Sequence, residues 1–306
     1  MSIEPAADAD FKTWLQQAWQ THADTPDAAM AELRRRAPQL PDSADGADAL
    51  RLAEHLWLVH QGDAAGLQAL LPQVPAHAAL AAQRRRTQWV LDTLAARPAA
   101  ALPEASRLRG LHSVVMVLLH RGDTAGARRL LLADEAAMLG RAAADNDDDA
   151  DTKADADADA DADALRGYAA TAHNTSNDIC DLLPREPARD ALMLEAAALA
   201  HRLWSATGAW LNIERADYQL ARCHAVLGQG EPALRHAQAC LARCEAEGAD
   251  AVERFFAHEV LARAHQALGN GEGAAEHQRQ MRTLLAAMPD DDLRAACVDA
   301  LAALGA

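Results

Sequence analysis

"LARCHAVLGQGEPA", residues 220–233, returns forty-one residues later as "LARAHQALGNGEGA", residues 261–274. Nine of the fourteen positions are identical, including the glycine pairs Gly228/Gly269 and Gly230/Gly271. A second pair lies nearer the N-terminus, where "HQGDAAGLQALL" (60–71) and "HRGDTAGARRLL" (120–131) share seven of twelve positions. Self-similarity of this kind indicates a supersecondary unit that buries its apolar face by stacking on a neighbouring copy.

The composition favours helices over strands. Half of the 306 residues are apolar but only 4% are aromatic, and Ala and Leu dominate, which is a selection that helices favour and strands do not. Apolar residues recur at spacings of three and four, the pattern of amphipathic helices. We therefore predict an all-α protein, with helices over 9–22, 27–37, 46–61, 64–71, 77–96, 104–121, 124–143, 165–183, 187–207, 209–227, 231–247, 251–269, 272–287 and 290–304.

One segment interrupts this pattern. Residues 145–164 read "DNDDDADTKADADADADADA", and their ten Asp and one Lys account for −9 of the net charge of −16. Alternating Asp and Ala buries too little apolar surface to offset the entropy of ordering, and the like charges repel. We predict a disordered linker here, between an N-terminal helical-repeat lobe (1–144) and a C-terminal lobe (165–306) that ends in a capping helix.

The repeated stretches resemble the tetratricopeptide repeat (TPR) family. Its pattern of Leu and a small residue, then Gly, then Ala is matched by Leu220-Ala221, Gly228 and Ala233, and again 41 residues later. The family's own period is 34, and His stands here where the family has Tyr, so the copies are degenerate. The runs at 171–180, 203–224 and 252–262 also resemble a group of proteobacterial TPR-like proteins. The resemblance implies an α-solenoid of antiparallel helix pairs, with the acidic segment as an interruption.

In TPR proteins the first helix of each pair lines a concave groove that binds peptides. With Gly228 and Gly269 as the register, the resemblance assigns a polar and aromatic set to that groove on three successive units. The set is His173, Asn174, Asn177, Arg215, Tyr218, Arg222, Phe256, Glu259 and Arg263. Two arginines at equivalent positions can bind carboxylates or carbonyls of a ligand. The competing interpretation is that Arg222 and Arg263 pair with acidic residues of the chain itself.

Other functional classes have less support. His236, Cys240 and Cys244 share one helix face, but a structural zinc site draws four ligands from two elements, so we interpret the cysteines as small buried apolar residues. The Arg triplets at 34–36 and 84–86 lack the net positive charge and interleaved aromatics of a nucleic-acid interface.

We expect a cytoplasmic, non-enzymatic interaction module that binds a protein or peptide, with no catalytic, cofactor or metal site, no nucleic acid and no membrane span. Five cysteines, with no basic-then-apolar leader, favour a reducing compartment. One alternative is a catalytic or metal-dependent protein that uses His173, Glu195, His201 and Glu214. The other is a self-associating scaffold, and the residues predict no oligomeric state.

Overall fold

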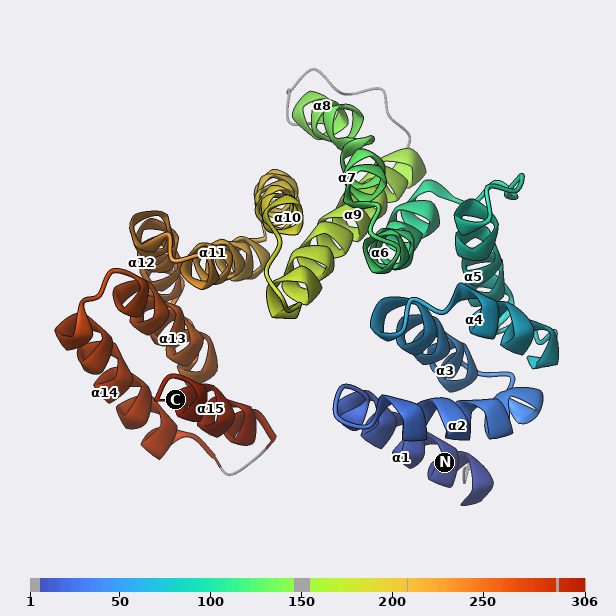
Figure 1. Cartoon of the computed structure of the whole chain (residues 1–306), viewed down its shortest axis with the longest axis horizontal. Helices are drawn as coiled ribbons and strands as arrows, with labels where there is room; N and C mark the ends of the chain where they lie inside the picture. Colours follow the sequence, from blue (N-terminus) through green and yellow to red (C-terminus); the bar gives the residue numbers. More distant parts are fainter. Residues whose placement is uncertain (1–5, 146–154, 208, 290–291, 306) are drawn as a thin grey trace. The chain divides into compact units, whose positions relative to one another are not determined.

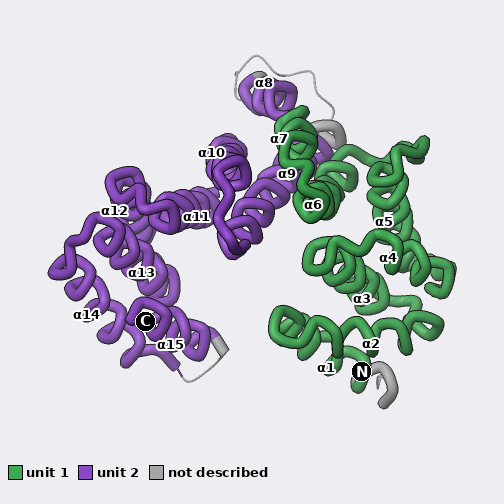
Figure 2. Tube along the Cα trace, viewed as in Figure 1, with its two compact units in different colours: residues 1–133 green, residues 134–306 purple. Residues whose placement is uncertain are grey.

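The computed structural model describes residues 6–145, 155–207, 209–289 and 292–305. Within these ranges the chain consists of helices and turns, and no strand occurs in them. None of the helices described is long and apolar enough to cross a bilayer. The chain divides into two compact units, Met1–Ala133 and Asp134–Ala306 (Figure 2).

Unit 1 is built from short helices that follow one another along the chain (Figure 1). They are α1 (Ala6–Thr21), α2 (Pro26–Arg36), the 3₁₀ turn η1 (Ala37–Gln39), α3 (Ala44–Glu54), the π-helical turn η2 (His55–His60), α4 (Ala64–Leu70), the 3₁₀ turn η3 (Leu71–Gln73), α5 (Ala81–Leu94), α6 (Glu104–His120) and α7 (Thr124–Leu132). Their apolar faces share one core around the fully buried Trp57.

Unit 2 contains longer helices. They are α8 (Glu135–Asp145), α9 (Asp155–Asp181), α10 (Pro187–Thr207), α11 (Trp210–Val226), α12 (Gly230–Ala246), α13 (Ala251–Ala267), α14 (Gly271–Ala287) and α15 (Asp292–Ala303). Consecutive helices from α9 to α14 pack against each other, and α11 also contacts α9 and α13. The alternate helices α9, α11 and α13 therefore contact one another in order.

The two copies of the repeated sequence form the same local structure in unit 2. Gly228 and Gly269 have φ of 68° and 70°, a left-handed conformation that glycine adopts without steric cost. In each copy the backbone amide of the residue after this glycine closes the end of the helix with the same hydrogen bond. Gln229 N–H donates to His224 O at 2.9 Å, and Asn270 N–H donates to His265 O at 2.9 Å.

Small side chains from the two copies occupy successive cores. Ala221 and Ala233 are fully buried in the cluster formed by α11, α12 and α13. Ala262, the counterpart of Ala221, is fully buried in the following cluster, formed with α14 and α15. Ala221 and its counterpart Ala262 are thus buried in two different clusters, one helix pair apart.

The earlier pair of similar stretches also forms matching turns, within unit 1. Gly62 and Gly122 have φ of 63° and 76°. Asp63 and Asp123 each cap the following helix by accepting a hydrogen bond at 2.8 Å from an amide three residues on. An Asp at this position satisfies an amide that the helix itself leaves without a partner.

Three sequence expectations differ from the structure. Residues 155–164, assigned to the disordered linker, form the first turns of α9, because Ala favours helix and Asp is stabilised near a helix N-terminus. The rest of that linker, 146–154, lies outside the described residues. The helix expected over 124–143 is two helices, α7 and α8, and the compact units divide between Ala133 and Asp134 rather than at 145–164.

Candidate binding cavity on α9, α11 and α13

Three alternate helices of unit 2 line one cavity of about 330 Å³. Its walls come from α9, α11 and α13, and Leu293 of α15 closes one side. The full lining is His173, Asn177, Glu214, Arg215, Tyr218, Gln219, Val252, Glu253, Phe256 and Leu293. Five of the nine residues assigned to a groove from sequence are in this set: His173, Asn177, Arg215, Tyr218 and Phe256.

Two aromatic rings form the apolar wall. The Tyr218 and Phe256 rings meet edge to face, with centroids 6.1 Å apart and planes at 82°. Both side chains are half-buried, and Leu293 beside them is 58% exposed. Burial, reinforced by the charge of Glu259, raises the pKa of Tyr218, so its hydroxyl remains protonated. An exposed leucine beside an aromatic pair offers apolar surface to a ligand.

Charged groups on α11 and α13 form a polar edge. Arg215 on α11 pairs with Glu253 on α13 at 2.5 Å across the cavity. The Arg215 side chain is 54% exposed, so this ion pair contributes little stability and its guanidinium can reorient toward a ligand. Burial, reinforced by the charges of Arg215 and Arg222, lowers the pKa of His173, so at neutral pH its imidazole is uncharged.

Glu214 is an acid buried in the cavity wall. It is 1% exposed, and its Oε1 accepts hydrogen bonds from the Cys240 thiol at 2.8 Å and the Cys244 thiol at 3.6 Å. Its Oε2 has no hydrogen-bond partner among the described residues. Burial raises the pKa of Glu214, with a further contribution from Glu253. A protonated Oε2 can donate to a ligand and an ionised one can accept.

Four residues expected in the groove do not line this cavity within the described residues. Arg222 donates to Asn177 Oδ1 at 2.7 Å and forms an ion pair with Asp181. Arg263 forms an ion pair with Glu259, one turn earlier on the same helix. Asn174 is exposed elsewhere on α9. Both arginine side chains are thus held by acidic residues of the chain, as the competing interpretation has it.

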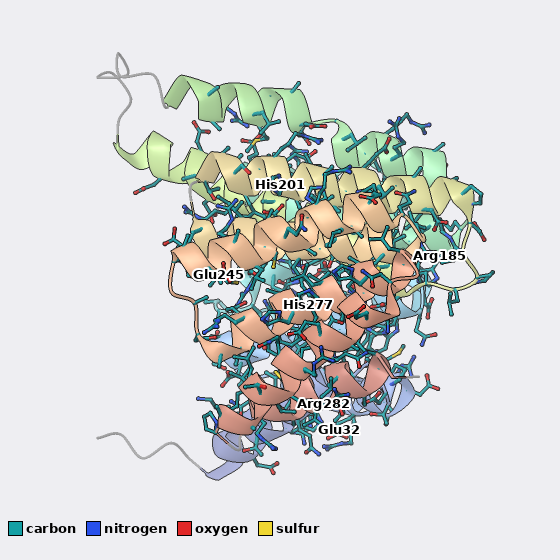
Figure 3. All side chains as sticks on the ribbon, turned by 90° about the vertical axis from the view of Figure 1, so that its left-hand side faces the viewer. Glu32, Arg185, His201, Glu245, His277 and Arg282 are labelled. Atoms are coloured by element: carbon teal, nitrogen blue, oxygen red, sulfur yellow. The ribbon has the colours of Figure 1, made fainter. Side chains whose placement is uncertain are left out.

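A second cavity, of about 410 Å³, lies between α10, α11 and α12. Its lining includes Glu195 and His201, which is labelled on α10 in Figure 3. Nearby, the buried Asp217 accepts hydrogen bonds at 3.2 Å from both His201 and His236. Burial would raise the pKa of Asp217, but the two histidines lower it to about 2.

The candidates for a catalytic group are thus divided between two cavities. Glu195 and His201 line the second cavity, whereas His173 and Glu214 line the first. The four do not form one cluster, and no arrangement of nucleophile, base and orienting group joins them.

A search against models of known protein families and a search of curated proteins both find no match to the chain.

His236, Cys240 and Cys244 do not converge on one point. His236 pairs with Asp217, whereas the two cysteines are fully buried and face Glu214. The hydrogen bond with Cys244, together with burial, raises the pKa of the Cys240 thiol, which favours its protonated form. The interpretation of both cysteines as buried core residues is consistent with this packing, but no pattern in the sequence indicates their contact with Glu214.

Proposed function

We propose that unit 2 is a TPR-like interaction module that binds an extended peptide segment in the cavity on α9, α11 and α13. One observation carries the proposal: residues chosen from a repeat register on three successive first helices line a single cavity. The equivalent turns at Gly228 and Gly269 support a stack of repeated helix pairs, as in an α-solenoid. All five cysteines are free and buried, in keeping with a reducing compartment such as the cytoplasm.

The lining indicates what kind of peptide would fit. Tyr218, Phe256 and Leu293 provide a pocket for one apolar side chain. Around them, Asn177, Arg215 and Glu253 supply donors and acceptors that suit the amides and carbonyls of a peptide backbone. We therefore propose a ligand with an apolar anchor residue flanked by polar backbone contacts.

A displayed library of random peptides, selected on the full chain, tests the proposal. Enriched peptides should share an apolar anchor, and their affinity is then measured by fluorescence anisotropy. Arg215→Ala and Asn177→Ala should each weaken binding about 5- to 30-fold, the loss of one or two hydrogen bonds. Arg215 is exposed and Asn177 is half-buried, so both substitutions should leave the helices, and with them the circular dichroism spectrum, unchanged.

Arg279→Ala is the matched control. Arg279 is 60% exposed and pairs with Glu276 on α14, so its removal changes charge and one surface ion pair outside the cavity. It should bind selected peptides as the parent does. Selection that enriches no peptide, or peptides that bind the Arg215 and Asn177 variants as tightly as the parent, would refute the proposal.

A further inference from the structure

Three histidines converge in unit 1, whereas the cavity described above belongs to unit 2. The Nε2 atoms of His22 and His60 each lie 3.1 Å from Nε2 of His55. The ring centroids are 4.8 to 5.1 Å apart, and all three side chains are half-buried. One ligand atom from each residue falls in a group no wider than 4.8 Å.

The π-helical turn η2 creates this convergence. In an α-helix, residues five apart point about 140° away from each other. The wider i→i+5 winding places His55 and His60 on nearly the same side of the helix. The Gln61 amide donates at 3.2 Å to the carbonyl oxygen of Leu56, five residues earlier, which is the hydrogen bond that defines this winding. His22, in the turn that follows α1, completes the group.

The tautomer of His22 suits a metal ligand. Its Nδ1 lies 2.7 Å from the carbonyl oxygen of Trp19. A carbonyl only accepts, so Nδ1 carries the hydrogen and Nε2 presents its lone pair to the other two rings. Metal-bound histidines are oriented by such an outer hydrogen bond. Trp19 is itself fixed, because its Nε1 donates to Asp48 Oδ2 at 2.9 Å.

Hydrogen bonds alone fit this group poorly. A neutral imidazole nitrogen is a donor or an acceptor but not both, so Nε2 of His55 cannot form a full hydrogen bond with each of its two neighbours at once. A cation instead accepts lone pairs from all three. Tetrahedral Zn²⁺ with Zn–N bonds of about 2.0–2.1 Å separates its ligand atoms by about 3.3 Å, close to the 3.1 Å that separates His55 Nε2 from each of the other two Nε2 atoms.

We propose that His22, His55 and His60 form a binding site for a divalent transition metal, with Zn²⁺ as the ion that fits best. Imidazole nitrogen is a ligand that zinc, copper and nickel favour. Three protein ligands leave a fourth position, which water or another small ligand occupies, as in open zinc sites.

The test uses the full chain without a polyhistidine tag, treated with a chelator and then freed of it. Isothermal titration with Zn²⁺ should show a site at one ion per chain. His22→Gln and His60→Gln should each weaken that site by more than about 100-fold, because outer-shell changes alone cost about 10- to 100-fold. His77→Gln, a histidine of the same unit outside the group, should bind as the parent does.

Co²⁺ substitution separates this site from the buried Glu214, Cys240 and Cys244 group, whose ligand atoms also lie within 4.8 Å of one another. An all-nitrogen site gives visible d–d absorption without a thiolate charge-transfer band. His22 lies in a turn, so its variant remains informative if His60→Gln fails to fold. Zinc binding that is absent in the parent, or unchanged in the folded His22→Gln variant, would overturn the proposal.

Discussion

Alanine substitution at four glycines of unit 2 tests whether the two sequence copies are structural repeats. An alanine Cβ at Gly228 or Gly269 would meet no neighbouring atom within 4 Å, so only the backbone conformation matters. The left-handed region costs an L-residue about 1–2 kcal/mol. Alanine also reduces the conformational entropy of the unfolded chain, which offsets about 0.4–1 kcal/mol of this cost. We expect each substitution to destabilise unit 2 by about 1 kcal/mol, and by the same amount.

The next glycine of each copy should behave differently. A Cβ on Gly230 would lie 2.6 Å from Leu268 Cγ and 2.9 Å from the Leu268 amide nitrogen, so backbone in the following pair would have to move. That overpacking costs about 1–3 kcal/mol. A Cβ on Gly271 would meet nothing within 4 Å, and alanine there should stabilise the helix by up to about 1 kcal/mol.

Hydrogen exchange measured by mass spectrometry at increasing urea concentrations gives the free energy of local opening for each segment from α11 to α14. Gly230→Ala should be less stable than Gly271→Ala by about 1–4 kcal/mol. The reasoning is refuted if the two substitutions cost the same, or if Gly228→Ala and Gly269→Ala differ by more than about 1 kcal/mol.

Three further outcomes are expected. Ser113→Ala, which removes a 2.8 Å hydrogen bond to the buried Glu54, should lower the unfolding free energy of unit 1 by about 1–3 kcal/mol in a urea titration. Because its folded pKa is lowered to about 2, Asp217 contributes stability above about pH 4 that is lost as pH falls toward 2; Asp217→Asn should lack that loss, about 2 kcal/mol, in acid titrations by circular dichroism. Burial and the charge of His277 lower the pKa of His258 to about 4, so as pH falls from 6.5 the unfolded chain binds a proton at this residue before the folded chain does. The midpoint temperature of thermal unfolding should therefore fall less between pH 6.5 and 4 in His258→Gln than in the parent.

The sequence predicts most helices of unit 2 to within two residues. The helix expected over 251–269 is α13 (Ala251–Ala267), with Asp250 capping it through the amides of Val252 and Glu253. Apolar spacing and capping residues are local, so they are legible in one chain. The break between α7 and α8 at 133–134 carries no glycine or proline, and the periodicity gives no sign of it.

The cavity was predicted only in part, for a physical reason. Repeat register places Tyr218 and Phe256 on one surface, and both line the same cavity, because the register depends on helix geometry alone. The partners of Arg222 come from α9, 41 and 45 residues earlier, and no local pattern reveals such pairs. The histidine group was missed because it depends on a π-helical turn, which α-helical spacing does not predict.

A crystal structure of the chain with a selected peptide would show whether the cavity on α9, α11 and α13 is the binding site. We expect the peptide to lie against these three helices, with its apolar anchor between Tyr218, Phe256 and Leu293. A peptide bound instead in the cavity beside His201, or along a surface without these helices, would contradict it.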